Sequence, residues 1–217
     1  MSFVHATVAE VRVAVYDPEG NVVEERVFPT HSFTFSFANV FLAEFFGSPG
    51  LTSPPSPAWP ITDVNGNVYL IGYGYGNSIG QLTLPMCVVG CPNLSPYASS
   101  VINAPGIWAG YSQCNVTSSA IGPCSPIPAS VLSPGPLYVP TMVSAGSPGW
   151  QYMVNQNLYN VSGNTITIGS LALVAALYAT LISTGILYSV LVDNVNPVLS
   201  LPPGYYISVT YTITLPV

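Results

Sequence analysis

The side chains that most often carry catalysis or bind metals are scarce in this sequence and stand apart from one another. His5 and His31 have no second histidine or cysteine at the spacing of a metal-ligand pair. Glu24 and Glu25 are adjacent, so on a strand they would point to opposite faces and could not act on one substrate together. The sequence therefore predicts no catalytic residue, no metal site and no cofactor.

A glycine-rich run, IGYGYGNSIG, contains Gly72, Gly74, Gly76 and Gly80 and could be compared with a nucleotide-binding loop. However, no lysine follows it and no helical pattern begins after it. Strand glycines that alternate with tyrosines fit close backbone packing better. Serines and threonines are plentiful, but no neighbouring base would activate a hydroxyl. We therefore expect that the chain is not an enzyme.

The four cysteines, Cys87, Cys91, Cys114 and Cys124, fall in one stretch rich in proline, glycine and serine. Their spacing is not that of a zinc ribbon, so two disulfides that clamp a long loop are the better interpretation. Four cysteines allow three pairings, and the sequence does not choose among them. Disulfides indicate an exported protein or one made inside a hyperthermophile.

Three sequons and the start of the chain bear on modification and export. Asn93, Asn115 and Asn160 each begin an N-x-S/T sequence and are predicted glycosylation positions. The opening MSFVHATVAEVRV has neither the charged start nor the apolar run of a signal peptide. We therefore expect no cleaved secretory leader.

Charge is almost absent from most of the chain. Charged residues make up 5 % of the 217 residues, there is no lysine, and the only cations are Arg12 and Arg26. After Glu44 the only charged side chains are Asp63 and Asp193. Such a surface repels itself little, which favours association, and it changes little in acid or salt. This composition indicates an exposed, densely packed protein of hot or acidic surroundings, and excludes nucleic acid as a partner because phosphate binding needs cations.

The clearest local prediction is a hairpin near the start. Residues 8–16 alternate, with Val11, Val13 and Val15 on one face, and residues 22–28 return as a second strand. The DPEGN sequence at 17–21 supplies a turn in which Asp17 caps the backbone and Gly20 accepts positive φ. Asn65-Gly66 predicts a second hairpin.

Residues 36–46 predict one helix, with Ser36 as N-cap and Gly47 as C-cap. Strands are predicted at residues 68–75, 81–89, near Trp108, and at 137–144, 150–154, 158–161, 164–168, 186–192 and 205–215. Residues 158–161 and 164–168 are expected to form a hairpin about Ser162-Gly163, and residues 171–182 fit either a helix or a strand.

These elements predict a mainly β, antiparallel β-sandwich or jelly roll with one short N-terminal helix. We expect a single domain over 1–217, in which 1–47 form the hairpin and helix and 87–136 form a long disulfide-clamped loop region. Irregular coil is expected at 47–60 and 118–136. Residues 168–192 are uncharged and long enough to span a membrane, but no flanking cation would orient them and Ser183, Thr184 and Gly185 interrupt them, so spanning is not expected.

The opening VRVAVYDPEGNVVEERVFPTHSFTFSFANVFLAEFF resembles the start of virion surface and tail-type proteins of thermophilic archaeal viruses. DVNGNVYLIGYG and the closing LPPGYYISVTYTITLP are similar to the middle and last strands of that family. The resemblance covers the two ends and leaves residues 87–154 unmatched. It implies a structural role in a virion, as a capsid, turret, spike or tail component.

The first hypothesis is therefore a homo-oligomeric virion protein whose partners are other virion structural proteins and the host cell surface. The second is an extracellular filament or surface-layer subunit of a thermophile, joined by donation of the terminal strand. The third is a carbohydrate-binding module, because tyrosine and tryptophan are abundant.

Overall fold

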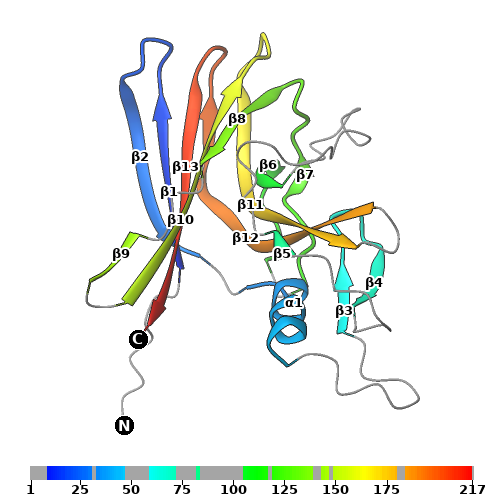
Figure 1. Cartoon of the computed structure of the whole chain (residues 1–217). Coiled ribbons are helices and arrows are strands. Elements are labelled where there is room, and N and C mark those ends of the chain that lie inside the picture. The colour runs from blue at the N-terminus through cyan, green and yellow to red at the C-terminus, as the bar shows by residue number, and fades with distance from the viewer. Residues whose placement is uncertain are drawn as a thin grey trace, which may run out of the picture.

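The described residues fold mainly into antiparallel strands that form two large sheets around a common core, with one helix among them (Figure 1). This confirms the predicted fold class. The computed structural model describes residues 9–30, 33–46, 59–71, 82–83, 105–116, 119–138, 143–146, 149–179 and 184–216.

The first sheet has the strand order β2-β1-β13-β10-β8, with β9 also paired to β10. Its strands are β1 (Ala9–Tyr16), β2 (Val22–Pro29), β8 (Leu132–Tyr138), β9 (Val143–Gly146), β10 (Gly149–Asn160) and β13 (Tyr206–Pro216). The closing strand β13 lies between β1 and β10 and is paired on both sides. Strands from both ends of the chain therefore form the middle of this sheet.

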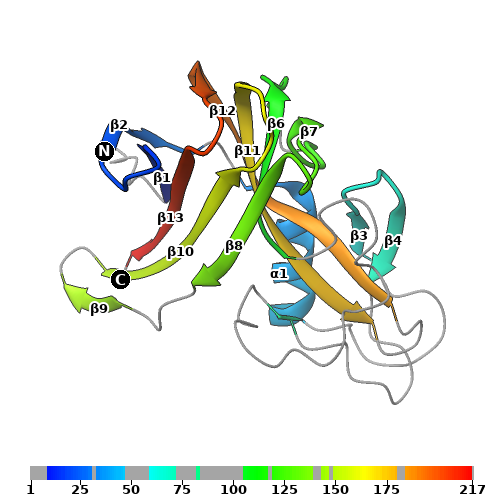
Figure 2. The same cartoon turned by 90° about the horizontal axis from the view of Figure 1, so that it is seen from above.

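The second sheet has the order β12-β11-β6-β7, with β5 also paired to β11. Its strands are β5 (Leu82–Thr83), β6 (Gly106–Ser112), β7 (Cys124–Pro126), β11 (Ile166–Ala179) and β12 (Thr184–Leu201). Figure 2, the view from above, shows β11 and β12 continuing past the first sheet towards a small hairpin of β3 (Trp59–Thr62) and β4 (Val68–Ile71).

The core lies between the two sheets. Val11, Val13 and Val15 of β1 and Ile207 and Val209 of β13 are buried there, while the residues between them on β13 face outward. This is the predicted alternation. The predicted turn is also confirmed, because Asp17 Oδ1 accepts a hydrogen bond from Asn21 N at 2.7 Å.

The middle of β11, in the second sheet, is buried on both of its faces. Leu171, Leu173 and Ala175 of β11 enter the main core, whereas Ala172 and Val174 join a second cluster with Trp108 on the opposite face. A strand covered on both sides carries a continuous apolar run instead of an alternating one. That is why residues 171–182 fitted a helix and a strand equally well; β11 resolves the choice as a strand up to Ala179.

The helix α1 (Phe35–Phe46) begins one residue earlier than predicted, and its N-cap is different. Thr34, not Ser36, is the cap: its Oγ1 accepts a hydrogen bond from Phe37 N at 3.2 Å. The Ser36 hydroxyl instead donates to Thr62 O at 3.1 Å and accepts from Thr62 N at 3.0 Å. It therefore joins the helix to the small hairpin, while Thr34 N bonds to Val190 O of β12.

Three other predictions were wrong in part. Ser162-Gly163 does not close a hairpin, because β10 before it belongs to the first sheet and β11 after it belongs to the second. The loop expected at 87–136 holds strands β6 and β7 and the start of β8 in its described part. The single strand expected at 137–144 is divided between β8, which ends at Tyr138, and β9.

The uncharged window at 168–192 lies in β11 and β12, which pair with each other as antiparallel strands. Within the ranges that the structure describes, no helix has the length and apolar character needed to cross a membrane.

Candidate assembly surface

One broad face of the first sheet points away from the core, and we call its residues the outer polar face. Three rows of directly opposed residues define it, and they run across β2, β1, β13 and β10. The rows are Val27, Arg12, Thr210 and Asn155; Glu25, Ala14, Ser208 and Asn157; and Tyr16, Tyr206 and Tyr159. The face is thus mostly made of neutral side chains that can donate or accept hydrogen bonds.

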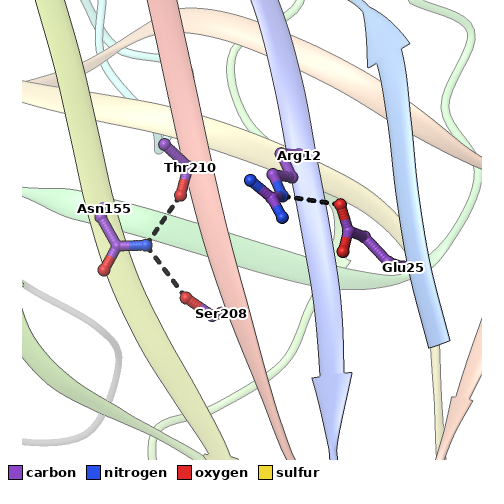
Figure 3. A network of polar contacts seen from close by, with 5 residues as sticks. All are labelled: Arg12, Glu25, Asn155, Ser208 and Thr210. Atoms are coloured by element: carbon purple, nitrogen blue, oxygen red, sulfur yellow. Dashed lines mark hydrogen bonds and ion pairs between the residues drawn. The ribbon is translucent and has the colours of Figure 1, made fainter. Parts of the chain in front are cut away.

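Short polar contacts hold the first two rows in place (Figure 3). Asn155 Nδ2 donates to Ser208 Oγ at 3.0 Å and to Thr210 Oγ1 at 2.8 Å. Arg12 Nε lies 2.8 Å from Glu25 Oε1 on the neighbouring strand. Both side chains of this ion pair remain exposed, so the pair contributes little to the free energy of unfolding, but it leaves this part of the face without net charge.

The third row is a ladder of tyrosine rings. The Tyr16 and Tyr206 rings stack with centroids 4.7 Å apart and planes 2° from parallel. The Tyr159 ring follows at 5.1 Å from Tyr206, tilted by 32°. Tyr206 therefore has a ring neighbour on each side and is only partly exposed. Burial and the neighbouring Tyr16, Tyr159 and Asp17 raise the pKa of Tyr206.

Ionised side chains are concentrated in the first hairpin. Glu10, Arg12, Asp17, Glu19, Glu24, Glu25 and Arg26 all lie within β1, β2 and their turn. Of the charged residues after position 30 whose side chains the structure describes, Asp63 is 5 % exposed and Asp193 is 0 % exposed. The described surface beyond the hairpin is therefore free of exposed charge.

The loop closed by cysteines lies on the second sheet. Cys114 and Cys124 form a disulfide, with Cα atoms 5.3 Å apart, which selects one of the three possible pairings. Asn194 of β12 holds the backbone of Cys114 through two hydrogen bonds, at 2.7 Å and 2.9 Å. Ser189 Oγ, also on β12, donates to Ile121 O at 2.9 Å. The loop is therefore fixed against the sheet and does not project freely.

Replacing Cys114 and Cys124 together with serine is expected to lower the free energy of unfolding by about 3 kcal/mol, because the bridge restricts a short loop in the unfolded chain. Urea unfolding of the double variant measures the change. Asn115→Ala, at an exposed position inside the same loop, is the control and is expected to leave the midpoint unchanged. An unchanged midpoint in the double-serine variant would contradict the prediction.

A buried polar pair lies in the main core. Tyr211 of β13 and Asp193 of β12 are both fully buried, and they come from the two facing sheets. Burial, followed by the nearby Asp193 carboxyl, holds the pKa of Tyr211 well above its usual value of 10.0. The fold thus favours the neutral phenol, so the stability that Tyr211 contributes is complete below about pH 10 and is lost at higher pH.

The contribution of Tyr211 should therefore be visible in how the free energy of unfolding changes with pH above about pH 10. We expect the free energy of unfolding to fall above about pH 10. The fall should be less steep in Tyr211→Phe, because the number of protons that the wild type releases on unfolding is larger by about one. Denaturant unfolding at several pH values measures both slopes, and Tyr138→Phe, at an exposed position, is the control. Equal slopes in the wild type and Tyr211→Phe would contradict this prediction.

The predicted glycosylation positions that the structure describes differ in their exposure to solvent. Asn115 is exposed, as an acceptor must be. Asn160 is 2 % exposed, and its Nδ2 donates to Asn164 O at 2.9 Å and Leu201 O at 2.8 Å. The folded chain leaves no space for a glycan on Asn160. Its side chain instead stabilises the turn between the two sheets. Asn93, Cys87 and Cys91 lie outside the described residues, as do His5, His31, Gly47 and the glycines of the IGYGYGNSIG run.

Two side chains that matter to the structure had no signal in the sequence. Gln156, 5 % exposed, accepts a hydrogen bond from Ile107 N at 2.6 Å and donates to Gly135 O at 2.9 Å. Ser170 donates to Ser112 O at 2.8 Å and accepts from Cys124 N at 3.0 Å. Their partners are far away in the sequence, so only the folded chain reveals these roles.

Metal binding and similarity to known proteins were the remaining sources of functional evidence. In the described part of the chain, no three or more His, Cys, Asp or Glu side chains gather where they could hold a metal ion. No family model, curated protein or solved structure matches the chain.

Proposed function

We propose that this chain is a self-assembling structural protein of a virion from a thermophilic archaeal virus: a capsid, turret, spike or tail component. The observation that carries the proposal is the distribution of charge. Beyond the first hairpin, the described charged side chains are buried, and the described surface carries neutral polar, aromatic and aliphatic groups. Such a surface lacks the self-repulsion that keeps proteins apart in solution.

The same surface suits an exposed particle in a harsh medium. Contacts made by hydroxyl, amide and aromatic groups do not titrate in acid and are little screened by salt. The resemblance of the two hairpins and the closing strand to virion proteins of thermophilic archaeal viruses supports the choice of a virion. The expected partners are copies of this chain, other virion proteins and the host cell surface.

Structural observations weigh against the other two hypotheses. A filament joined by donation of the terminal strand needs that strand to leave its own sheet, but β13 is paired on both sides. A glycan-binding platform needs open aromatic faces, but Tyr206, the central ring of the tyrosine row, has a stacked ring on one side and a tilted ring on the other.

The experiment has two arms. The purified chain, concentrated at neutral and acidic pH and at low and high salt, is followed by sedimentation and electron microscopy. We expect the chain to assemble under all of these conditions; a stable monomer at high concentration would contradict self-assembly. Antibodies against the chain, applied to purified virus particles, test its location, and unlabelled particles that contain every other structural protein would exclude the virion role.

A further inference from the structure

One of the two edge strands of the first sheet is β2, the other being β8, and most residues of β2 are exposed. Among the described strands, β1 alone pairs with β2, so one edge of β2 faces solvent (Figure 1). Exposed edge strands tend to pair with other chains, and charges, prolines and bulges limit that pairing. Because β2 carries all three, it can pair only with a partner strand that matches them. Val23 and Val27 are 53 % and 56 % exposed on this edge.

Backbone directions show which residues could pair there. Thr30 N donates to Ala9 O at 3.2 Å, so Thr30 points towards β1. Antiparallel residues alternate in direction, so Phe28, Arg26 and Glu24 also point towards β1, opposite Val11, Val13 and Val15. The N–H and C=O groups of Val27 and Glu25 therefore point outward.

Two features limit the length of the free segment. Pro29 lies at an outward position and has no N–H to donate. At the other end, the register shifts between Val15 and Tyr16, which leaves Val23 as the extra residue of a bulge. The usable edge is therefore residues 23–27, with the sequence VEERV.

This segment is complementary to itself when two copies run antiparallel with Glu25 at the centre. Val23 then lies opposite Val27, twice. Glu24 and Arg26 already form an ion pair within each copy, with N and O 2.6 Å apart, and in this register each also lies opposite the other residue type of the second copy, twice. Both are favourable cross-strand pairs. The central pair brings two Glu25 side chains together, but each already has Arg12 at 2.8 Å to neutralise it.

Shifting the register by one step in either direction removes this match. Centring on Glu24 would set Glu24 against itself and Val27 against Asn21. Centring on Arg26 would set two arginines against each other and place Pro29 at a hydrogen-bonding position. Only the Glu25 register matches the valines, the charges and the outward backbone groups together.

We infer that β2 pairs with β2 of a second copy of this chain, antiparallel and centred on Glu25, which joins the first sheets of two copies into one continuous sheet. The contact is isologous, because the same five residues are used on both sides. The inference rests on the proposed self-assembly and assigns one of its interfaces.

Val27→Lys tests the interface, and Val161→Lys is its matched control, since Val161 is 58 % exposed in the connection between the sheets. Analytical ultracentrifugation over a concentration series measures the dissociation constant of the pair. We expect roughly tenfold weaker association for Val27→Lys, because two symmetry-related valine pairs are lost, and no change for Val161→Lys. Equal association of both variants would overturn the inference.

Cross-linking tests the register directly. In Glu25→Cys the two new thiols face each other across the two-fold axis, where opposed Cα atoms are about 5.5 Å apart and within reach of a disulfide. We expect a covalent pair of chains under mild oxidation, and no faster cross-linking than wild type for Val68→Cys, at an exposed position on another hairpin. Equal rates for the two variants would overturn the inference.

The two proposals can fail separately. A Val27→Lys variant that associates as well as the wild type would overturn the β2 interface and leave self-assembly standing. A wild-type chain that is monomeric at every concentration would overturn both.

Discussion

Gly110→Ala is expected to lower the free energy of unfolding by about 3 kcal/mol or more, the upper range for overpacking a core. A Cβ at position 110 would lie 2.1 Å from Cys124 O of β7 and 2.6 Å from Ser170 Oγ of β11. The nearest of these atoms belongs to backbone, so relief would require β6 and β7 to separate. The pairing of Gly110 with Pro126 and of Ser112 with Cys124 would then be lost.

Thermal and urea unfolding of Gly110→Ala measure this effect. Gly163→Ala is the matched control, because a Cβ at Gly163 would have no atom within 4 Å. We expect that variant to unfold close to wild type. If the two alanine variants were equally stable, the close approach of β6, β7 and β11 would not be as tight as described.

Gln156→Leu is expected to cost about 3 kcal/mol of unfolding free energy although it keeps most of the side-chain volume. The amide of Gln156 joins the two sheets: it accepts from Ile107 N of β6 and donates to Gly135 O of β8. Leucine would leave the buried Ile107 N–H without this partner, and an orphaned buried polar group costs more than a hydrogen bond contributes. The contact is close, since a Cβ at Gly106 would lie 2.8 Å from Gln156 Oε1.

Gln113→Leu is the control for this substitution. Gln113 also bonds to a backbone carbonyl, that of Val195 at 3.1 Å, but its side chain is exposed. Water can replace that bond, so we expect a loss of about 1 kcal/mol or less. A Gln156→Leu protein as stable as Gln113→Leu would show that the link between the sheets contributes little.

Local features of the fold were the ones that the sequence predicted well. The DPEGN and DVNGN segments form turns with the same geometry: the Asp side chain accepts from the backbone of the Asn four residues later, at 2.7 Å in both. Gly20 and Gly66 have positive φ, +88° and +85°. These turns depend on residues within the segment itself, so their chemistry can be read from the sequence.

Features that depend on distant partners were missed. Thr34 and Ser36 are both good N-cap residues. The Ser36 hydroxyl is bonded to the backbone of Thr62, so Thr34 caps the helix. Ser162-Gly163 marks a turn correctly, but whether the chain returns along the same sheet or crosses to the other depends on the strands that compete for pairing. The importance of Gln156 depends on Ile107, 49 residues away.

The candidate surface was foreseen in composition but not in position. The shortage of charge beyond Glu44 predicted a neutral exterior, and the burial of Asp63 and Asp193 makes the described part more neutral still. The tyrosine ladder could not be foreseen, because Tyr16, Tyr159 and Tyr206 meet only through the register of β1, β13 and β10. Register is a property of the assembled sheet.

The two sheets differ in how they meet water, and this has a consequence for how the molecule opens. Strand β11 is covered on both faces, whereas β1 and β13 have one face against solvent. Amide protons in the middle of β11 should therefore exchange only when the whole molecule unfolds, and those of β2 through smaller, frequent fluctuations. The second sheet is then the rigid unit, and the β2 edge that would meet a neighbour lies in the part of the protein that fluctuates most.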